Sequence, residues 1–242
     1  MYLLLDANVT AGYYLPRSLD SRRARGRIRV IFDSTRSHAS SPVLYIPNFC
    51  VAEVFSVFAK HAFGKWNRHV KKKKGTIDKR VYKSLVRQFG SDIHNGAFLN
   101  QYELSRYHIL GIDLVAPVDH HYQISRGTKK NHKPAGTFDH LIISMGIQLA
   151  HLHGPANVAI VTADRRIGRI VDRCRNGIPA RIVRKLKLDR AQEVTGRPFS
   201  PNIFPQCLEL STCKNADLAA LLGAWPLTIG NDLPAVYRWT YD

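Results

Sequence analysis

The segment Met1-Tyr-Leu-Leu-Leu-Asp6-Ala-Asn8 decides the fold, because an acid and an amide directly follow a short run that is apolar throughout. Such a run, here Tyr2–Leu5, is typical of a strand buried on both faces of a parallel sheet. The segment Val158-Ala-Ile-Val-Thr162-Ala-Asp164 has the same arrangement in the second half of the chain. We therefore expect a parallel sheet with acidic side chains at the carboxyl ends of its strands.

Strand-like and helix-like segments alternate along residues 1–185, which indicates one α/β domain with about five parallel strands and helices on both faces. The predicted strands are Tyr2–Leu5, Val43–Ile46, Ile112–Val115, Val158–Thr162 and Ala180–Arg184. The predicted helices are Thr10–Leu15, Leu19–Ser37, Phe49–Phe63, Arg80–Phe89, Gly96–Leu110, Phe138–Leu152, Arg165–Cys174 and Ala216–Leu222. We expect a basic exposed insertion at about residues 64–80, and a C-terminal extension at 186–242 that packs on the core or contacts a partner.

The chain is strongly basic, with 36 Lys and Arg against 18 Asp and Glu, a net charge of +18 and a pI near 10.1. Of the 36 basic residues, 18 lie between Arg17 and Arg87, and two further clusters lie at Arg126–Lys133 and Arg165–Lys187. One such run is typical of a solvated helix face, but three on one chain favour a polyanionic partner. The predicted nucleic-acid contacts are Lys71, Lys72, Lys73, Lys74, Lys129, Lys130, Arg165 and Arg166.

Cysteine spacing and hydropathy argue against several classes of protein. The four cysteines, Cys50, Cys174, Cys207 and Cys213, contain no CxxC pair, which disfavours a zinc site and a disulfide framework. The histidines also lack convincing metal-ligand spacing. The sequence has no run of 18 apolar residues and no signal peptide, so we expect a cytoplasmic protein that makes no membrane contact.

The candidate catalytic residues are four acids, Asp6, Glu53, Asp139 and Asp164. Asp6 and Asp164 follow predicted strands, whereas Asp139 and Glu53 lie near the starts of predicted helices. Carboxylates that meet at one sheet edge repel each other unless a cation lies between them, and Mg²⁺ or Mn²⁺ prefers such oxygen ligands. A bound ion of this kind activates water for attack on a phosphodiester. Asn8 and Thr162 are expected to support the ligands by orienting them.

Each of these residues also has a purely structural interpretation. Asp139 and Asp164 could be helix N-caps, and Asp6 could lie in an Asx-turn. Asn8 is equally consistent with a helix N-cap, and Thr162 with a hydroxyl that bonds the backbone. A fifth acid, Asp172, lies eight residues beyond Asp164 on a predicted helix, about 12 Å along its axis, which is too far to share one ion.

Four segments resemble the PIN-domain nucleases, the family that includes the VapC-type toxins of toxin–antitoxin pairs. They are Leu3-Leu-Leu-Asp6-Ala-Asn8, Val51-Ala-Glu53-Val-Phe, Phe138-Asp139-His-Leu-Ile-Ile-Ser-Met and Val161-Thr162-Ala-Asp164. The resemblance covers roughly residues 1–185 and implies a three-layer fold around a parallel sheet. It also implies that Asp6, Glu53, Asp139 and Asp164 bind Mg²⁺ or Mn²⁺ to hydrolyse RNA, with Asn8 and Thr162 in support. The chain departs from a compact toxin in its greater length and in the longer gap between Asp139 and Asp164.

The resemblance predicts a metal-dependent endoribonuclease that acts on single-stranded or loop regions of RNA, in a toxin–antitoxin pair or in RNA processing. A catalytically silent PIN-like protein that binds RNA through its basic surface is the alternative. Leu5-Asp6-Ala-Asn8-Val-Thr10 also faintly resembles the nucleophile motif of haloacid-dehalogenase-like phosphatases, although Asn8 stands where that motif requires a second Asp. The sequence leaves open an inhibitory protein partner and a homodimer.

Overall fold

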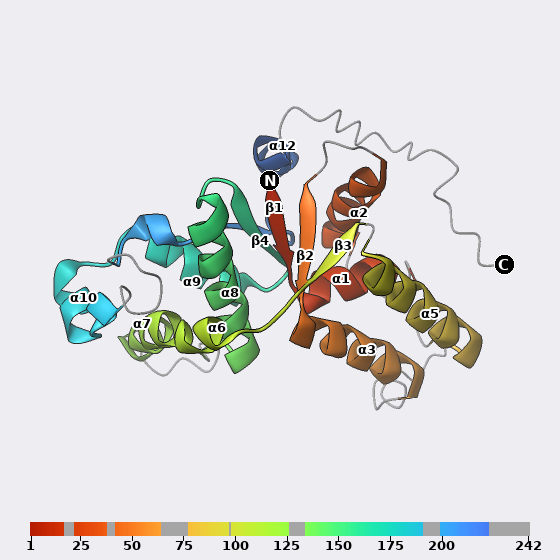
Figure 1. The fold of residues 1–242 in the computed structure, drawn as a ribbon, viewed down its shortest axis with the longest axis horizontal. Helices are drawn as coiled ribbons and strands as arrows, with labels where there is room; N and C mark the ends of the chain where they lie inside the picture. Colours follow the sequence, from red (N-terminus) through yellow and green to blue (C-terminus); the bar gives the residue numbers. More distant parts are fainter. Residues whose placement is uncertain are drawn as a thin grey trace.

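The structure is a computed structural model that describes residues 1–16, 22–37, 42–63, 77–96, 98–125, 134–190 and 199–222. Its five strands form one all-parallel sheet in the order β3-β2-β1-β4-β5 (Figure 1). The strands are β1 (Tyr2–Leu5), β2 (Val43–Pro47), β3 (Leu99–Tyr102), β4 (Val158–Thr162) and β5 (Gln206–Glu209). The prediction of an α/β fold with about five parallel strands is confirmed.

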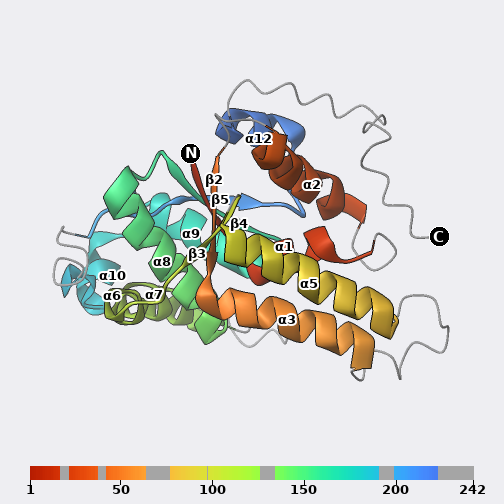
Figure 2. The ribbon, with the colours of Figure 1, turned by 45° about the vertical axis from the view of Figure 1, so that its right-hand side comes forward.

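Helices cover both faces of the sheet, so the fold has three layers (Figure 1). One side carries α1 (Ala7–Tyr14), α2 (Arg22–Ser37), α3 (Asn48–Phe63) and α5 (Lys79–Asn95), of which α3 and α5 lie side by side (Figure 2). The other side carries α6 (Arg106–Leu110), α7 (Ile112–Ser125), α8 (Thr137–His153), α9 (Arg165–Arg175) and α10 (Ala180–Lys185). The remaining described elements are α12 (Asn215–Leu222) and the short 3-10 helices Leu188–Arg190 and Pro201–Ile203.

Strand β1 is central because its backbone pairs with β2 on one side and with β4 on the other. Tyr2 is aligned with Val43 of β2 and with Val158 of β4. Its leucines, Leu3–Leu5, are fully buried, as a strand covered by helices on both faces requires. The chain therefore leaves the carboxyl edge of the sheet at the next residue, which is Asp6.

Two of the predicted strands are wrong, because both segments are helical. Ile112–Val115 lies in the first turns of α7, and Ala180–Arg184 lies within α10. Four or five residues with a few apolar side chains do not distinguish a strand from a turn of helix. In α7 the buried residues Leu114, Val115 and Val118 recur with helical spacing, and the helix continues through Pro117.

Two strands of the sheet come from segments that the sequence did not predict as strands. Strand β3 lies inside the predicted helix Gly96–Leu110, because Gly96 ends α5 in the left-handed conformation with φ of 57°. Strand β5 pairs in parallel with β4, with Gln206 aligned with Ala159. Residues beyond 185 thus complete the sheet.

Several predictions fall on segments of the chain that the structure does not describe. Residues 64–76 of the predicted insertion are among them, as are residues 191–198 and 223–242 of the predicted extension. None of the described helices is both long enough and apolar enough to cross a membrane.

Candidate functional site

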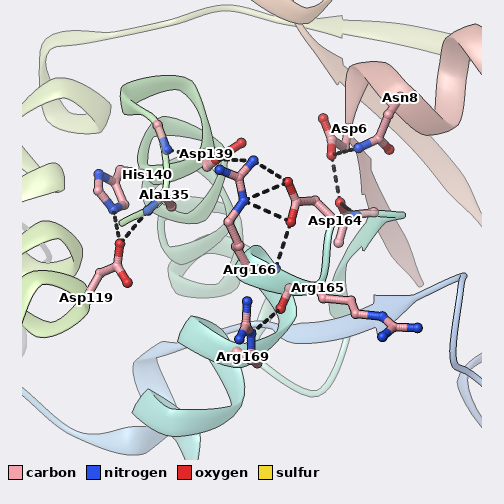
Figure 3. Close-up of polar contacts among 12 residues, drawn as sticks. Asp6, Asn8, Asp119, Ala135, Asp139, His140, Asp164, Arg165, Arg166 and Arg169 are labelled. Atoms are coloured by element: carbon pink, nitrogen blue, oxygen red, sulfur yellow. Dashed lines mark hydrogen bonds and ion pairs between the residues drawn. The ribbon is translucent and has the colours of Figure 1, made fainter. Parts of the chain in front are cut away.

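Asp6 is the most buried of the four predicted acids, with 5% of its surface exposed. Its position is fixed by the backbone, because its N–H donates to the carbonyl oxygen of Val161 at 3.0 Å. The Oδ2 atom of Asp6 accepts two hydrogen bonds of 2.6 Å, one from the Asn8 amide and one from the Thr162 hydroxyl (Figure 3). Asp6 therefore faces the site as a carboxylate held by the ends of two adjacent strands.

Thr162, the last residue of β4, and Asn8, in the first turn of α1, connect the segment after β1 to the segment after β4. The Thr162 hydroxyl, fully buried, donates to Asp6 and accepts from the backbone N–H of Asp164 at 2.9 Å. The Asn8 side chain donates to Asp6 and accepts from the backbone N–H of Ala163 at 3.1 Å. Both side chains therefore hold Asp6 in place, and their orienting role at a metal site stays a prediction. Asn8 lies inside α1 rather than at its N-cap, which is Asp6.

Asp6, Glu53 and Asp139 form a cluster of mutually repelling carboxylates. Burial, together with the charges of Asp139 and Glu53, raises the pKa of Asp6 from 3.8 to about 6, although the Thr162 hydrogen bond acts to lower it. Partial burial and the charge of Asp139 raise the pKa of Glu53, while Lys60 on the same helix lowers it. The charges of Asp139 and Glu53 act on Asp6, and the charge of Asp139 acts on Glu53, so the end of β1, α3 and α8 place these acids near one another.

Cys50 lies close enough to the same acids to be affected by their charges. It is fully buried in α3. Burial raises the pKa of Cys50, and the nearby charges of Asp6 and Glu53 raise it further. The Cys50 thiol is therefore kept neutral.

Asp164 is paired with a guanidinium from its own helix. The Nε atom of Arg166 donates to both Asp164 oxygens, at 3.2 and 3.0 Å, and a terminal nitrogen donates to Asp164 Oδ2 at 2.5 Å. The same terminal nitrogen lies 3.5 Å from Asp139 Oδ2 (Figure 3). Burial acts to raise the pKa of Asp164, but the hydrogen bonds and charge of Arg166 outweigh it and hold the pKa below its ordinary value.

The N-cap interpretation holds for one of the two acids to which it applied. Asp164 is the N-cap of α9, and its Oδ1 atom accepts from the backbone N–H of Arg166 at 2.7 Å. Asp139 is not a cap, because the N-cap of α8 is Gly136. The Oδ2 atom of Asp139 accepts from the backbone N–H of Gly136 at 2.9 Å, which fixes the acid in the first turn of the helix.

A second buried acid, Asp119, supports the start of α8. Its Oδ2 atom accepts from the backbone N–H of Ala135 at 2.7 Å and lies 3.1 Å from His140 Nε2. Asp119 is 2% exposed and His140 is 4% exposed. Burial acts to raise the pKa of Asp119, but the hydrogen bonds from His140, Ala135 and Gln123 lower it below its ordinary value. This network fixes the segment that carries Asp139 (Figure 3).

The structure places the predicted nucleic-acid contacts unevenly. The Arg165 side chain is 65% exposed, and its Nε atom lies 3.9 Å from Glu209 Oε1. Arg166 points instead at the acids. Lys71, Lys72, Lys73, Lys74, Lys129 and Lys130 lie outside the described residues.

The donors at the site suit a hard divalent cation, since they are carboxylate, amide and hydroxyl oxygens. Asp6, Asp139 and Glu53 also carry unfavourable mutual charge that such an ion would relieve. Within the described part of the chain, however, no three His, Cys, Asp or Glu side chains converge closely enough to hold a metal. The Arg166 guanidinium lies between Asp139 and Asp164, where an ion shared by these two acids would sit.

Asp172 faces a different part of the molecule. With Cys207, Glu209 and Arg169 it lines a cavity of about 330 Å³ between α9 and β5. Burial raises the pKa of Asp172, and Glu209 raises it further against the effect of Arg175. Asp6, Asp139 and Asp164 do not line this cavity.

The sequence reasoning missed the roles of Asp119 and of Arg166. Asp119 lies 21 positions before its partner His140, so no local spacing connects them. The Asp164-x-Arg166 spacing is a weak signal, because a long cationic side chain two residues after an N-cap aspartate can fold back onto it.

Comparison with protein-family models gave no match for this chain, and a search of curated proteins gave none either.

Proposed function

We propose that this protein is a metal-dependent endoribonuclease with a PIN-like fold. The observation that carries the proposal is that the charges of Asp139 and Glu53 act on Asp6, which places these three acids near one another. The Arg166 guanidinium pairs with both Asp139 and Asp164 and so joins the fourth acid to this group. These acids lie at or beside the carboxyl ends of parallel strands, where open α/β sheets bind their ligands. The net charge of +18 supports a nucleic-acid substrate.

The four acids would hold Mg²⁺ or Mn²⁺, which polarises a phosphate oxygen and provides a hydroxide-like water at neutral pH. Asp6 contributes a carboxylate whose orientation is fixed by Asn8 and Thr162. Asp139 contributes a second carboxylate from the helix start that Asp119 fixes. Such fixed placement matters because small misplacements of catalytic groups reduce rates strongly.

The basic residues would bind the RNA backbone outside this cluster. Arg165 is exposed at the start of α9, beside Asp164, and can contact a phosphate without moving the acids. We propose the same role for Lys71–Lys74 and for Lys129 and Lys130. A cytoplasmic location, a homodimer, and an inhibitory partner of the toxin–antitoxin kind are further proposals that follow from the PIN-like assignment.

An RNA-binding protein without nuclease activity is the second candidate function. It is favoured by one observation, which is that Arg166 already neutralises two of the acids. Under this alternative the acids stabilise the fold in pairs with cations and bind no metal.

The test that separates the two functions is cleavage of a mixed pool of structured RNAs and single- and double-stranded DNAs. It is run with Mg²⁺, with Mn²⁺ and with EDTA, for the wild type and for Asp6→Asn and Asp164→Asn. Asp172→Asn is the matched control. Asp172 lies on α9, the helix that carries Arg166, but it lines a different cavity, so this variant removes an acidic charge without touching the site. We expect metal-dependent RNA cleavage by the wild type and by the control, with a loss of at least a hundredfold in the two site variants. RNA binding without cleavage under every condition would favour the second candidate.

A further inference from the structure

The arginines at the start of α9 have three different environments. Arg165 is largely exposed, and Arg169 donates through Nε to the backbone carbonyl of Arg165 at 3.1 Å. Arg166 instead reaches two acids of the site, with a terminal nitrogen 2.5 Å from Asp164 Oδ2 and 3.5 Å from Asp139 Oδ2 (Figure 3). The sequence does not distinguish these residues, because all three are arginines in one basic helix.

The guanidinium of Arg166 holds the two oxygen atoms that a shared metal would need. The Oδ1 atom of Asp164 accepts a hydrogen bond from the backbone N–H of Arg166 at the start of α9. A cation that binds Asp164 does not have to break this hydrogen bond. Its other oxygen, Oδ2, accepts from the terminal nitrogen of Arg166 and faces Asp139. An ion bound between Asp139 and Asp164 must therefore take the place of that nitrogen.

The Arg166 side chain can leave this position without opening the core. It is 41% exposed, so the guanidinium borders solvent while it is paired with the acids. The bonds it would give up are charge-assisted and bidentate, which makes them stronger than an ordinary surface ion pair. Their partial exposure still limits their strength, because solvent screens them.

We propose that Arg166 is an internal counter-ion that competes with the divalent cation for Asp139 and Asp164. The inference rests on the proposed function, since it requires a metal site at these acids. Arg166 neutralises the acids in the metal-free protein, and the metal displaces it when it binds. Arg166 therefore lowers the metal affinity of the site and raises the stability of the metal-free fold.

The test is direct binding of Mn²⁺, measured by electron paramagnetic resonance and calorimetry on the full chain without RNA. The variants are Arg166→Gln, which removes the competing charge, and Arg166→Lys, which keeps the charge but loses the bidentate geometry. Arg169→Gln is the matched control, because it removes the same charge from the same helix without removing a hydrogen bond to an acid. We expect Arg166→Gln to bind Mn²⁺ about three- to tenfold more tightly than the wild type, Arg166→Lys to lie between them, and the control to change the Kd by less than twofold.

Thermal unfolding gives a second readout that does not depend on catalysis. In EDTA we expect Arg166→Gln to unfold at a lower temperature than the wild type, because its acids have lost their counter-ion. Saturating Mn²⁺ should raise the Tm of Arg166→Gln more than that of the wild type.

The outcomes distinguish this inference from the proposed function. Tighter Mn²⁺ binding by Arg166→Gln than by Arg169→Gln supports the competition. If the wild type binds Mn²⁺ and Arg166→Gln binds it equally or more weakly, the competition is refuted while the metal site stands. If neither the wild type nor any variant binds Mn²⁺, the metal site itself is refuted, and the competition with it. If Arg166→Gln does not fold, Arg166→Lys decides the question by the same criterion.

Discussion

Replacing Asp6 with asparagine should stabilise the metal-free protein while it destroys the proposed activity. Asp6 is 5% exposed and lies beside two other acids, so its ionised form is held at a cost to folding. Asparagine has almost the same shape and keeps a carbonyl oxygen for the hydrogen bonds from Asn8 and Thr162. The substitution thus removes the charge and retains its two side-chain donors.

The magnitude follows from the pKa. A rise from 3.8 to about 6 corresponds to about 3 kcal/mol of free energy of unfolding. Between these two values the folded state binds more protons at Asp6 than the unfolded state, so stability falls as the pH rises through this window. The full penalty is present above pH 6, about half of it remains at pH 5, and it is absent below 3.8. Because the amide nitrogen of asparagine fits less well next to the Ala7 N–H, we expect a net gain of about 1–3 kcal/mol at pH 8.

The assay is urea unfolding in EDTA at pH 8 and at pH 5, with Asp189→Asn as the control because Asp189 is exposed and lies outside the cluster. We expect Asp6→Asn to be more stable than the wild type at pH 8 and its advantage to shrink at pH 5. The control should show neither effect. An Asp6→Asn protein that is less stable than the wild type at pH 8, or an advantage that does not depend on pH, would refute the reasoning.

Two other substitutions test the groups that hold the acids. Thr162→Val removes the hydroxyl that donates to Asp6 and leaves the backbone N–H of Asp164 without that acceptor, so we expect a loss of about 1–3 kcal/mol in urea unfolding. Because this hydrogen bond lowers the pKa of Asp6, the acid limb of the cleavage profile should also move to higher pH, and an unmoved profile would contradict the assignment. Asp119→Asn weakens the charge-assisted contacts to Ala135 and His140, and we expect a loss of about 1.5–3 kcal/mol with a smaller loss of cleavage than Asp6→Asn causes. A variant as stable as the wild type would show that Asp119 does not support the start of α8.

The parts of the fold that could be predicted are those with a strong local pattern. Strands β1, β2 and β4 are the three inner strands of the sheet, and each is an apolar run of the kind that inner parallel strands have. Strands β3 and β5 lie at the edges, and half of the residues in each are polar, so neither forms the apolar run that identified β1. The helical segment Ile112–Val115 was mistaken for a strand because apolar residues in so short a segment do not show whether they repeat with the period of a helix or of a strand.

The site could be predicted in part, because strand ends place Asp6 and Asp164 at the same edge of any parallel sheet. The contact between Asp139 and Arg166 could not be predicted from the sequence. It depends on how α8 packs against α9 and on the direction in which the Arg166 side chain points from α9. The same holds for Asp119, whose hydrogen bonds join α7 to the start of α8. These contacts are set by tertiary packing rather than by sequence spacing.

The hydrogen bond from Thr162 to Asp6 joins residues that are 156 positions apart in the chain. During synthesis at about 5–20 residues per second, the strand before Asp6 emerges roughly eight to thirty seconds before the strand that ends at Thr162. Until then β1 lacks one of its two neighbours and Asp6 lacks one of its two side-chain donors. A nascent chain therefore has no assembled acidic site, and any chemistry of that site begins only after about two thirds of the polypeptide has left the ribosome.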